Sequence, residues 1–219
     1  MQIGVFRVMH IVVICNEAQK AELLTNGFSG DQEPVFLNDP EELNGIHLPS
    51  AIIDLQFQHD PARIKLLGSF LPALVIINSV SFVLLETNTS FVRINGWSSF
   101  LSSTLIEASC ISEELKKRTA DVFQQFNKTP AWLPDVPGFV TPRVVSMIIN
   151  EAFLALEEGV STKEEMDTAM KLGTNYPFGP FEWANKIGID NVLQLLKKLS
   201  FTETRYLPSF HLIQAGTAS

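Results

Sequence analysis

Residues 15–19 decide whether the first half of this chain could bind a dinucleotide. They read Cys-Asn-Glu-Ala-Gln and follow an apolar, β-branched run at residues 10–15, which predicts a strand buried on both faces. A dinucleotide-binding sheet needs a glycine-rich turn here, so that backbone amides at a helix N-terminus can approach the pyrophosphate. This turn has no glycine, and Glu17 places a carboxylate where the phosphates would lie. The turn therefore argues against ordinary dinucleotide binding and leaves Asn16 as a candidate cofactor contact.

Three further residues are candidates for chemistry, and each has a structural alternative. Asp39 lies roughly where an acidic partner of the cofactor ribose is expected, but an Asp before a proline in a loop is also typical of a turn. Cys15 and Cys110 are far apart in the sequence and lack metal-ligand spacing. We expect both to be reduced, buried thiols, and we expect no metal site.

The first 135 residues alternate between strand and helix patterns. Strands are predicted at residues 10–15, 34–37, 51–57, 74–77, 91–94 and 128–133. Helices are predicted at residues 16–26, 61–70 and 112–126. Gly27 would end the first helix, and Asp60 and Pro61 would cap and begin the second. This rhythm predicts an α/β domain at residues 1–135 with a Rossmann-like, mostly parallel sheet.

Residues 136–219 show helical periodicity and predict an all-α C-terminal domain, after a turn-rich hinge at residues 135–138. Thr141 and Pro142 have the types expected of the N-cap and first residue of a long helix. Ser161 and Glu164 form a capping-box pattern for the next helix, which Gly173 would end. Asp190 would cap a final helix that runs to residue 199.

The same half of the chain carries short motifs in a fixed order. They are PGF at 137–139, Arg143, NEA at 150–152, EGV at 158–160, DTAMKLG at 167–173, YPFGPFEW at 176–183 and IGID at 187–190. With these motifs, the region closely resembles the C-terminal helical domain of the 3-hydroxyacyl-CoA dehydrogenases. The resemblance is strong over the last 85 residues and covers the first 135 in outline. It implies a homodimer through the helical domain, an acyl-CoA ligand, NAD as the cofactor of an active member, and a place in fatty-acid metabolism.

The resemblance also aligns Asn95 and Glu107 with the family's proton-transfer pair. In the family segment HFFNPVPxMxLVEV, the His transfers a proton and the Glu twelve positions later orients it. An alignment anchored on residues 105–107 puts Asn95 on that His and Glu107 on that Glu. Asparagine does not exchange a proton near neutral pH, and losing general acid–base help typically costs about 10²–10⁴-fold in rate. A structural alternative stays open for Glu107, whose carboxylate would then bond Asn95 or backbone donors.

Residues 78–81 correspond to the family's N-[ST]-S-S motif. The substrate-contacting Ser of that motif is Val80 here, and Ser79 or Ser81 would replace it if the register shifted by one residue. Asn78 remains a candidate cofactor contact. The family pattern therefore implies catalytic candidates at Glu107, Asn95, Ser79 and Ser81, and cofactor-binding candidates at Asn16, Asp39 and Asn78.

The helical domain keeps the family's Arg143 but has Pro142 where the family has a substrate-contacting Asn. Proline offers neither a polar side chain nor an N–H, and the start of a helix explains its presence. A group of aromatic residues gives this small domain an apolar surface that it has little room to bury alone: Phe153, Phe178, Phe181 and Trp183. We therefore expect a homodimer through the C-terminal helices.

Composition narrows the class of partner. A hydrophobic share of 46% and a charged share of 18% suit a globular protein with a sizeable core. The net charge of −8 argues against nucleic acid or an anionic membrane as the main partner. There is no signal-peptide pattern and no apolar run of about 18 residues, so we expect a cytoplasmic protein.

Two functional hypotheses remain open from the sequence. In the first, the chain is a diverged, non-catalytic relative of the family that forms dimers and binds an acyl-CoA. In the second, it is an active NAD-dependent oxidoreductase that converts 3-hydroxyacyl-CoA to 3-oxoacyl-CoA. The missing glycines and the replaced His favour the first hypothesis, and the retained Glu107 favours the second.

Overall fold

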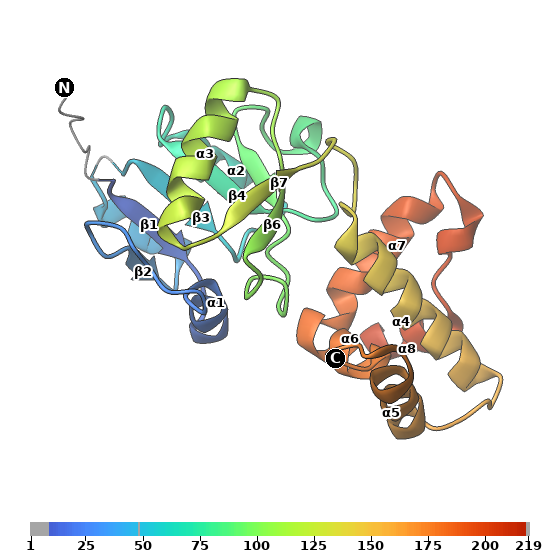
Figure 1. Cartoon of the computed structure of the whole chain (residues 1–219). Helices are drawn as coiled ribbons and strands as arrows, with labels where there is room; N and C mark the ends of the chain where they lie inside the picture. Colours follow the sequence, from blue (N-terminus) through green and yellow to red (C-terminus); the bar gives the residue numbers. More distant parts are fainter. Residues whose placement is uncertain (1–8, 48, 218–219) are drawn as a thin grey trace. The chain divides into compact units, whose positions relative to one another are not determined.

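The chain folds into two compact units. A computed structural model describes residues 9–47 and 49–217, and Figure 1 shows the helices and strands along the chain. The first unit ends at Asp135 and the second begins at Val136. Each unit has its own buried apolar side chains.

In the described residues, the first unit holds a seven-stranded sheet. In spatial order, the strands are β2 (Val35–Leu37), β1 (Ile11–Ile14), β3 (Ala51–Asp54), β4 (Leu74–Asn78), β5 (Val92–Ile94), β6 (Leu105–Ser109) and β7 (Thr129–Trp132). The first five strands pair in parallel, β6 runs antiparallel to β5, and β7 is parallel to β6. The predicted mostly parallel sheet is confirmed. The carboxyl ends of β1, β3, β4 and β5 therefore meet at one edge.

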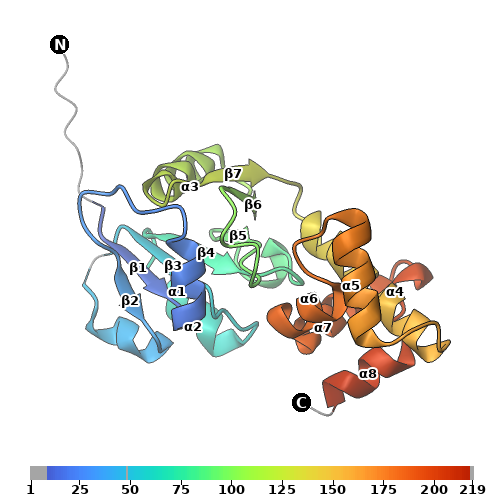
Figure 2. The same cartoon turned by 60° about the horizontal axis from the view of Figure 1, so that its bottom comes forward.

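Helices cover both faces of this sheet. α1 (Glu17–Leu23) and α3 (Glu113–Gln125) pack on one face, and Figure 2 shows α3 along that side. α2 (Pro61–Gly68) and the 3₁₀ turns η1 (Pro40–Gly45) and η2 (Leu84–Glu86) pack on the other. In β1, Val13 belongs to the first core and Val12 to the second, so the strand is buried on both faces. This explains why β1 reads as a continuous apolar run.

The second unit is all-α, as predicted. Its described elements are α4 (Thr141–Glu157), α5 (Lys163–Thr174), α6 (Pro180–Ile187), α7 (Ile189–Ser200), η3 (Thr204–Tyr206) and α8 (Phe210–Thr217). α4 packs against α6, α7 and α8. Among the residues that the structure describes, no helix is both long and apolar enough to cross a membrane.

Some predicted element boundaries were wrong. The first helix ends at Leu23, before the predicted residue 26, although Gly27 does adopt a positive φ of 81°. β6 was not predicted, because its sequence LIEAS is short and only pairing with β5 and β7 defines it as a strand. The helix predicted from Asp190 begins one residue earlier, after Gly188, and α8 follows it.

The predicted caps of the second unit were also displaced. Val140 is the N-cap of α4, so Thr141 and Pro142 occupy its first two positions. The capping box of α5 is formed by Thr162 and Glu165, because the chain enters the helix one residue later than predicted from Ser161 and Glu164. Asn175 takes the left-handed conformation (φ 56°) after α5, and Gly173 lies inside the helix.

The aromatic residues expected on the surface of the second unit are mostly in its core. Phe153, Phe181 and Trp183 are only 3%, 5% and 5% exposed, and Phe178 is half-buried. The rings of Phe153 and Phe181 pack edge to face at 5.0 Å, and Trp183 packs against Tyr176 and Phe178. The helices of one chain therefore bury these side chains without a partner. The argument for a dimer from an apolar aromatic surface is therefore wrong, and the dimer itself stays a prediction.

Candidate functional site

The turn after β1 uses its polar groups to cap α1. The Asn16 Oδ1 atom accepts the Gln19 N–H at 2.9 Å, and the Gln19 Oε1 atom accepts the Asn16 N–H at 3.0 Å. A phosphate at this position would need free backbone N–H groups. Two of them are already bonded to side chains, and the exposed Glu17 adds a negative charge beside them.

Side-chain amides also link neighbouring strands at the carboxyl edge. The Leu55 carbonyl, just after β3, accepts from Gln19 Nε2 at 2.9 Å and from Asn78 Nδ2 at 3.1 Å. The Asn78 Oδ1 atom accepts the Gly96 N–H at 2.9 Å. A Cβ at position 96 would lie 2.8 Å from Asn78 Cγ, so the close approach requires glycine. These bonds tie together the ends of β1, β3, β4 and β5.

This edge does not fit NAD as the residues now stand. A dinucleotide in a Rossmann-like sheet lies across the carboxyl ends of the strands, with its pyrophosphate at the first helix N-terminus. Here Gln19 bonds to Asn16 and to the Leu55 carbonyl after β3, and Asn78 at the end of β4 bonds to the same carbonyl. These bonds lie across the path of the dinucleotide. Asp39 accepts the Glu41 N–H at 2.8 Å as the N-cap of η1, which is the structural role left open above.

Asn95 and Glu107 lie side by side, as the alignment predicts. Their backbones pair where β5 leads into β6, with the Asn95 N–H donating to the Glu107 carbonyl at 2.9 Å. The Asn95 Nδ2 atom donates to Glu107 Oε2 at 3.1 Å, and both side chains are buried. Asn95 Oδ1 accepts the Trp97 N–H at 3.3 Å. The pair is thus a buried amide–carboxylate contact that keeps Glu107 in place, and the Asn95 amide cannot exchange a proton near neutral pH.

The serines after β4 shape a buried turn. The Ser79 hydroxyl donates to the Phe82 carbonyl at 2.9 Å and is 4% exposed. Ser81 is also buried, and Val80 between them is part of the core. These positions offer a ligand little accessible polar surface.

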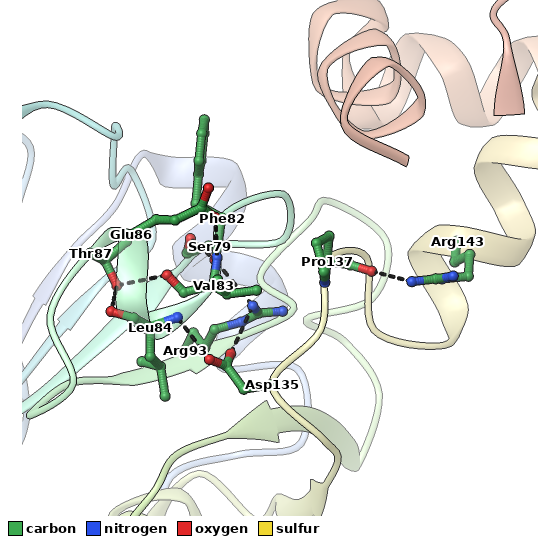
Figure 3. Close-up of polar contacts among 10 residues, drawn as sticks. All are labelled: Ser79, Phe82, Val83, Leu84, Glu86, Thr87, Arg93, Asp135, Pro137 and Arg143. Atoms are coloured by element: carbon green, nitrogen blue, oxygen red, sulfur yellow. Dashed lines mark hydrogen bonds and ion pairs between the residues drawn. The ribbon is translucent and has the colours of Figure 1, made fainter. Parts of the chain in front are cut away.

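A buried arginine that the sequence did not single out orders this turn (Figure 3). Arg93 on β5 donates from Nη1 to the Phe82 carbonyl at 3.1 Å and to Asp135 Oδ1 at 3.0 Å. The Leu84 N–H donates to Asp135 Oδ2 at 2.9 Å. Burial lowers the pKa of Arg93 to about 10, and Asp135 and Glu86 oppose that change. A lone Arg in a short strand carries no sequence signal for this role.

A second pair of charged residues fixes the loop that follows Asn95. The Glu22 carboxylate on α1 accepts the Ser98 hydroxyl at 2.7 Å and the Ser99 N–H at 2.8 Å. Lys128, 3% exposed, donates from Nζ to the Leu101 and Ser103 carbonyls. Burial lowers the pKa of Lys128, and Glu22 opposes this. The side chains of Glu22 and Lys128 therefore hold this loop through its backbone and the Ser98 hydroxyl.

The two cysteine thiols are not activated as nucleophiles. Cys15 is buried and Cys110 is half-buried, and both are free. Burial raises the pKa of Cys15 to about 11 and raises that of Cys110, so neither is a thiolate at neutral pH. In residues 9–47 and 49–217, no three His, Cys, Asp or Glu side chains are placed to hold a metal ion.

In the second unit, the retained motif residues join segments of the unit. Arg143 donates to the Pro137 carbonyl at 2.6 Å and to the Tyr206 hydroxyl at 3.3 Å. Asn150 donates to the Leu207 carbonyl at 3.0 Å and accepts the Ser209 N–H at 2.8 Å. The Asp167 carboxylate accepts the N–H groups of residues 181 and 182 at the start of α6. The motifs thus specify how the helices pack.

Comparison with known proteins also distinguishes the helical unit from the sheet unit. Residues 138–215 match the family model described as 3-hydroxyacyl-CoA dehydrogenase, C-terminal domain. The 3-hydroxyadipyl-CoA dehydrogenase of Escherichia coli is 42% identical over 106 residues, which are 47% of this chain and 22% of that protein. The 3-hydroxybutyryl-CoA dehydrogenase of Clostridioides difficile is 41% identical over 88 residues, 39% of this chain and 31% of that protein. The matched parts thus span less than a third of these two relatives.

The whole fold has a solved counterpart. The crystal structure of the (S)-3-hydroxybutyryl-CoA dehydrogenase of Ralstonia eutropha superposes with a TM-score of 0.72 and covers 97% of this chain and 94% of that chain. At 19% identity this likeness shows the fold alone. The sheet unit is therefore Rossmann-like in fold without the usual cofactor turn. The helical unit matches the C-terminal domain of the 3-hydroxyacyl-CoA dehydrogenases over residues 138–215.

Proposed function

We propose that this chain is a family member that has lost the NAD-dependent oxidation of 3-hydroxyacyl-CoA. The observation that carries the proposal is the set of side-chain amides across the carboxyl edge of the sheet. Gln19 and Asn78 both donate to the Leu55 carbonyl, and Gln19 also closes the capping box with Asn16. A dinucleotide at this edge would have to break these bonds, and its phosphates would meet the Glu17 carboxylate and two N–H groups that are already bonded to side chains.

The proton-transfer position supports the same proposal. Asn95 stands where the resemblance expects His, and its amide is bonded to Glu107 and to the Trp97 N–H. An amide cannot act as the general base that removes the hydroxyl proton of a substrate. Glu107 therefore has a structural partner in place of a catalytic one.

The role that we propose instead is binding. The relatives above are named for 3-hydroxyadipyl-CoA and 3-hydroxybutyryl-CoA, and we propose an acyl-CoA as the ligand, in fatty-acid metabolism. The free thiols of Cys15 and Cys110 suit a cytoplasmic location. A family member that catalyses no reaction can still bind or present such a ligand, since a fold does not fix a function.

Titration of the chain with NAD in a calorimeter tests the proposal. We expect a Kd above about 1 mM, weaker than about −4 kcal/mol, because the turn after β1 has no glycine, two of its N–H groups are bonded to side chains, and Glu17 adds a negative charge. We also expect no NADH from 3-hydroxybutyryl-CoA. Micromolar NAD affinity would contradict the proposal, and turnover would establish the alternative, an active dehydrogenase.

The variant Asn95→His distinguishes the loss of the proton-transfer residue from the loss of NAD binding. It restores a His next to Glu107, so it would regain activity if the proton-transfer group were the only defect. We expect no NADH from this variant either, because residues that act together in catalysis give little when one is repaired alone. Asn95→Gln is the matched control, because it enlarges the side chain at the same site and keeps an amide that does not titrate near neutral pH.

We also propose a homodimer through the second unit. Its exposed apolar side chains include Val140 and Val144, one turn apart on the first turns of α4, and Leu207 and Phe210 around the start of α8; these are 53–63% exposed. α4 and α8 pack against each other, which places both sets on one pair of helices. Light scattering should give twice the 24.4 kDa mass of the chain, and Val144→Arg should give the monomer mass. A parent chain with the monomer mass would reject this proposal.

A further inference from the structure

Two arginines of the second unit converge on one tyrosine hydroxyl. Arg143 Nη1 lies 3.3 Å and Arg205 Nη2 lies 3.1 Å from the Tyr206 hydroxyl oxygen. The two guanidinium carbons are 5.6 Å and 4.9 Å from the centre of the Tyr206 ring. Tyr206 itself is 5% exposed. The cluster therefore consists of two cations set around a buried ring whose oxygen both of them reach.

Three elements hold this cluster in place. Arg143 lies in the first turn of α4, and its Nη2 atom donates to the Pro137 carbonyl at 2.6 Å (Figure 3). Tyr206 ends η3, and η3 packs on α7. Arg205 precedes it and has an exposed side chain. One guanidinium is thus anchored inside the unit, and the other stands at the surface.

The charges of this cluster are not balanced within the chain. Among residues 9–47 and 49–217, neither Arg143 nor Arg205 has a carboxylate oxygen within 4.0 Å. Two like charges that share one acceptor repel each other, and a guanidinium has five N–H donors to satisfy. Because the Tyr206 oxygen accepts from both arginines, its own proton is available to donate. An anion at the cluster would relieve the repulsion and accept from all three groups.

We propose that Arg143, Arg205 and Tyr206 form a binding site for a phosphate group. The planar fork of arginine matches a phosphate with two parallel N–H bonds, and a doubly charged phosphate matches two cations. The phosphate could come from a CoA-type ligand or be a free phosphate ion, and the chemistry of the site is the same for both. Only the CoA source rests on the acyl-CoA binding proposed above. The site lies wholly in the second unit and is independent of NAD.

Calorimetric titration with CoA, dephospho-CoA and inorganic phosphate tests this site. In the parent chain we expect saturable phosphate binding. CoA that binds more tightly than dephospho-CoA would assign the ribose phosphate to the site. Equal affinity of the two would assign the diphosphate that both carry, and binding of phosphate without either of them would assign a free phosphate ion. No binding of any of the three probes would overturn the proposal.

Three variants assign the binding to the cluster. Arg205→Gln, at an exposed side chain, should weaken binding by about tenfold or more, the effect typical of losing one charge-assisted hydrogen bond. Tyr206→Phe should weaken it less, since it removes only the hydroxyl. Arg118→Gln is the matched control, because it removes one half-buried arginine from the first unit. Equal weakening by Arg205→Gln and Arg118→Gln would show an effect of net charge alone and would reject the site, while the NAD result above would stand unchanged.

Discussion

Replacing Arg63 with alanine should lower the free energy of unfolding of the sheet unit by about 3–5 kcal/mol. Arg63 Nε donates to Asp54 Oδ2 at 2.7 Å and Arg63 Nη2 donates to Oδ1 at 2.9 Å. The Asp54 side chain is 0% exposed and that of Arg63 is 9% exposed. Without Arg63, the carboxylate keeps only the Gln56 N–H at 3.1 Å. A buried charge would then stand without its partner at the end of β3.

The pH dependence identifies the cause of this loss. Burial raises the pKa of Asp54, and Arg63 opposes that rise. In the variant the pKa should rise further, and an acid whose folded pKa exceeds its unfolded value destabilises the fold as pH rises. The deficit should therefore be largest near neutral pH and shrink as pH falls through the raised pKa of Asp54 in the folded variant, where the carboxylate takes up a proton.

Urea unfolding of the Arg63→Ala variant and of the parent, at several pH values, measures this deficit. Lys65→Ala is the matched control, because Lys65 is an exposed cation on the same helix and should change stability by less than about 0.5 kcal/mol. A deficit of similar size for both variants would rule out the buried ion pair as the cause.

Gly179→Ala should destabilise the helical unit by about 3 kcal/mol. Gly179 is the glycine of the YPFGPFEW motif and the N-cap of α6. A Cβ there would overlap the Asp167 side chain from its Cβ to its carboxylate. That carboxylate accepts the Phe181 N–H at 2.8 Å and the Glu182 N–H at 3.2 Å. The substitution must therefore displace the group that caps α6.

Gly173→Ala provides the comparison for this prediction. Gly173 lies inside α5, and a Cβ there would meet nothing within 4 Å. Alanine should be neutral or stabilise the helix by up to about 1 kcal/mol. Thermal unfolding of the two variants should shift the midpoint in opposite directions or leave Gly173→Ala unchanged. A Gly179→Ala variant as stable as the parent would mean that Asp167 is not needed as a cap.

Much of the architecture could be predicted from local sequence. The runs that became β1 and β4 are buried on both faces, so their apolar composition is itself a strand signal. Asp60 and Ser112 cap α2 and α3 as predicted, because a cap depends on residues three positions away. The motifs from Gly138 onward identified the family, because they encode packing within one helical unit.

Part of the candidate site was also readable. Asn95 and Glu107 were paired by alignment, and they are hydrogen-bonded in the fold. The absence of glycine at residues 15–19 was visible in the sequence, but the contacts that the side chains make at this edge of the sheet were not. Gln19 reaches the carbonyl of residue 55, and Asn78 reaches both that carbonyl and residue 96. Such contacts join residues that are 18–36 positions apart in the sequence, so no local sequence pattern predicts them.

The sequence by itself determined the family that the helical unit matches, the alternation of strands and helices, and the presence of Asn95 where the resemblance expects a His. Only the tertiary structure decided that Phe153, Phe181 and Trp183 face the core, that Arg93 and Arg63 are buried partners of Asp135 and Asp54, and that two arginines meet at Tyr206. The physical reason is the separation along the chain over which each effect acts. Propensities and caps act within a few residues, whereas burial and charge pairing depend on which distant segments the fold brings together.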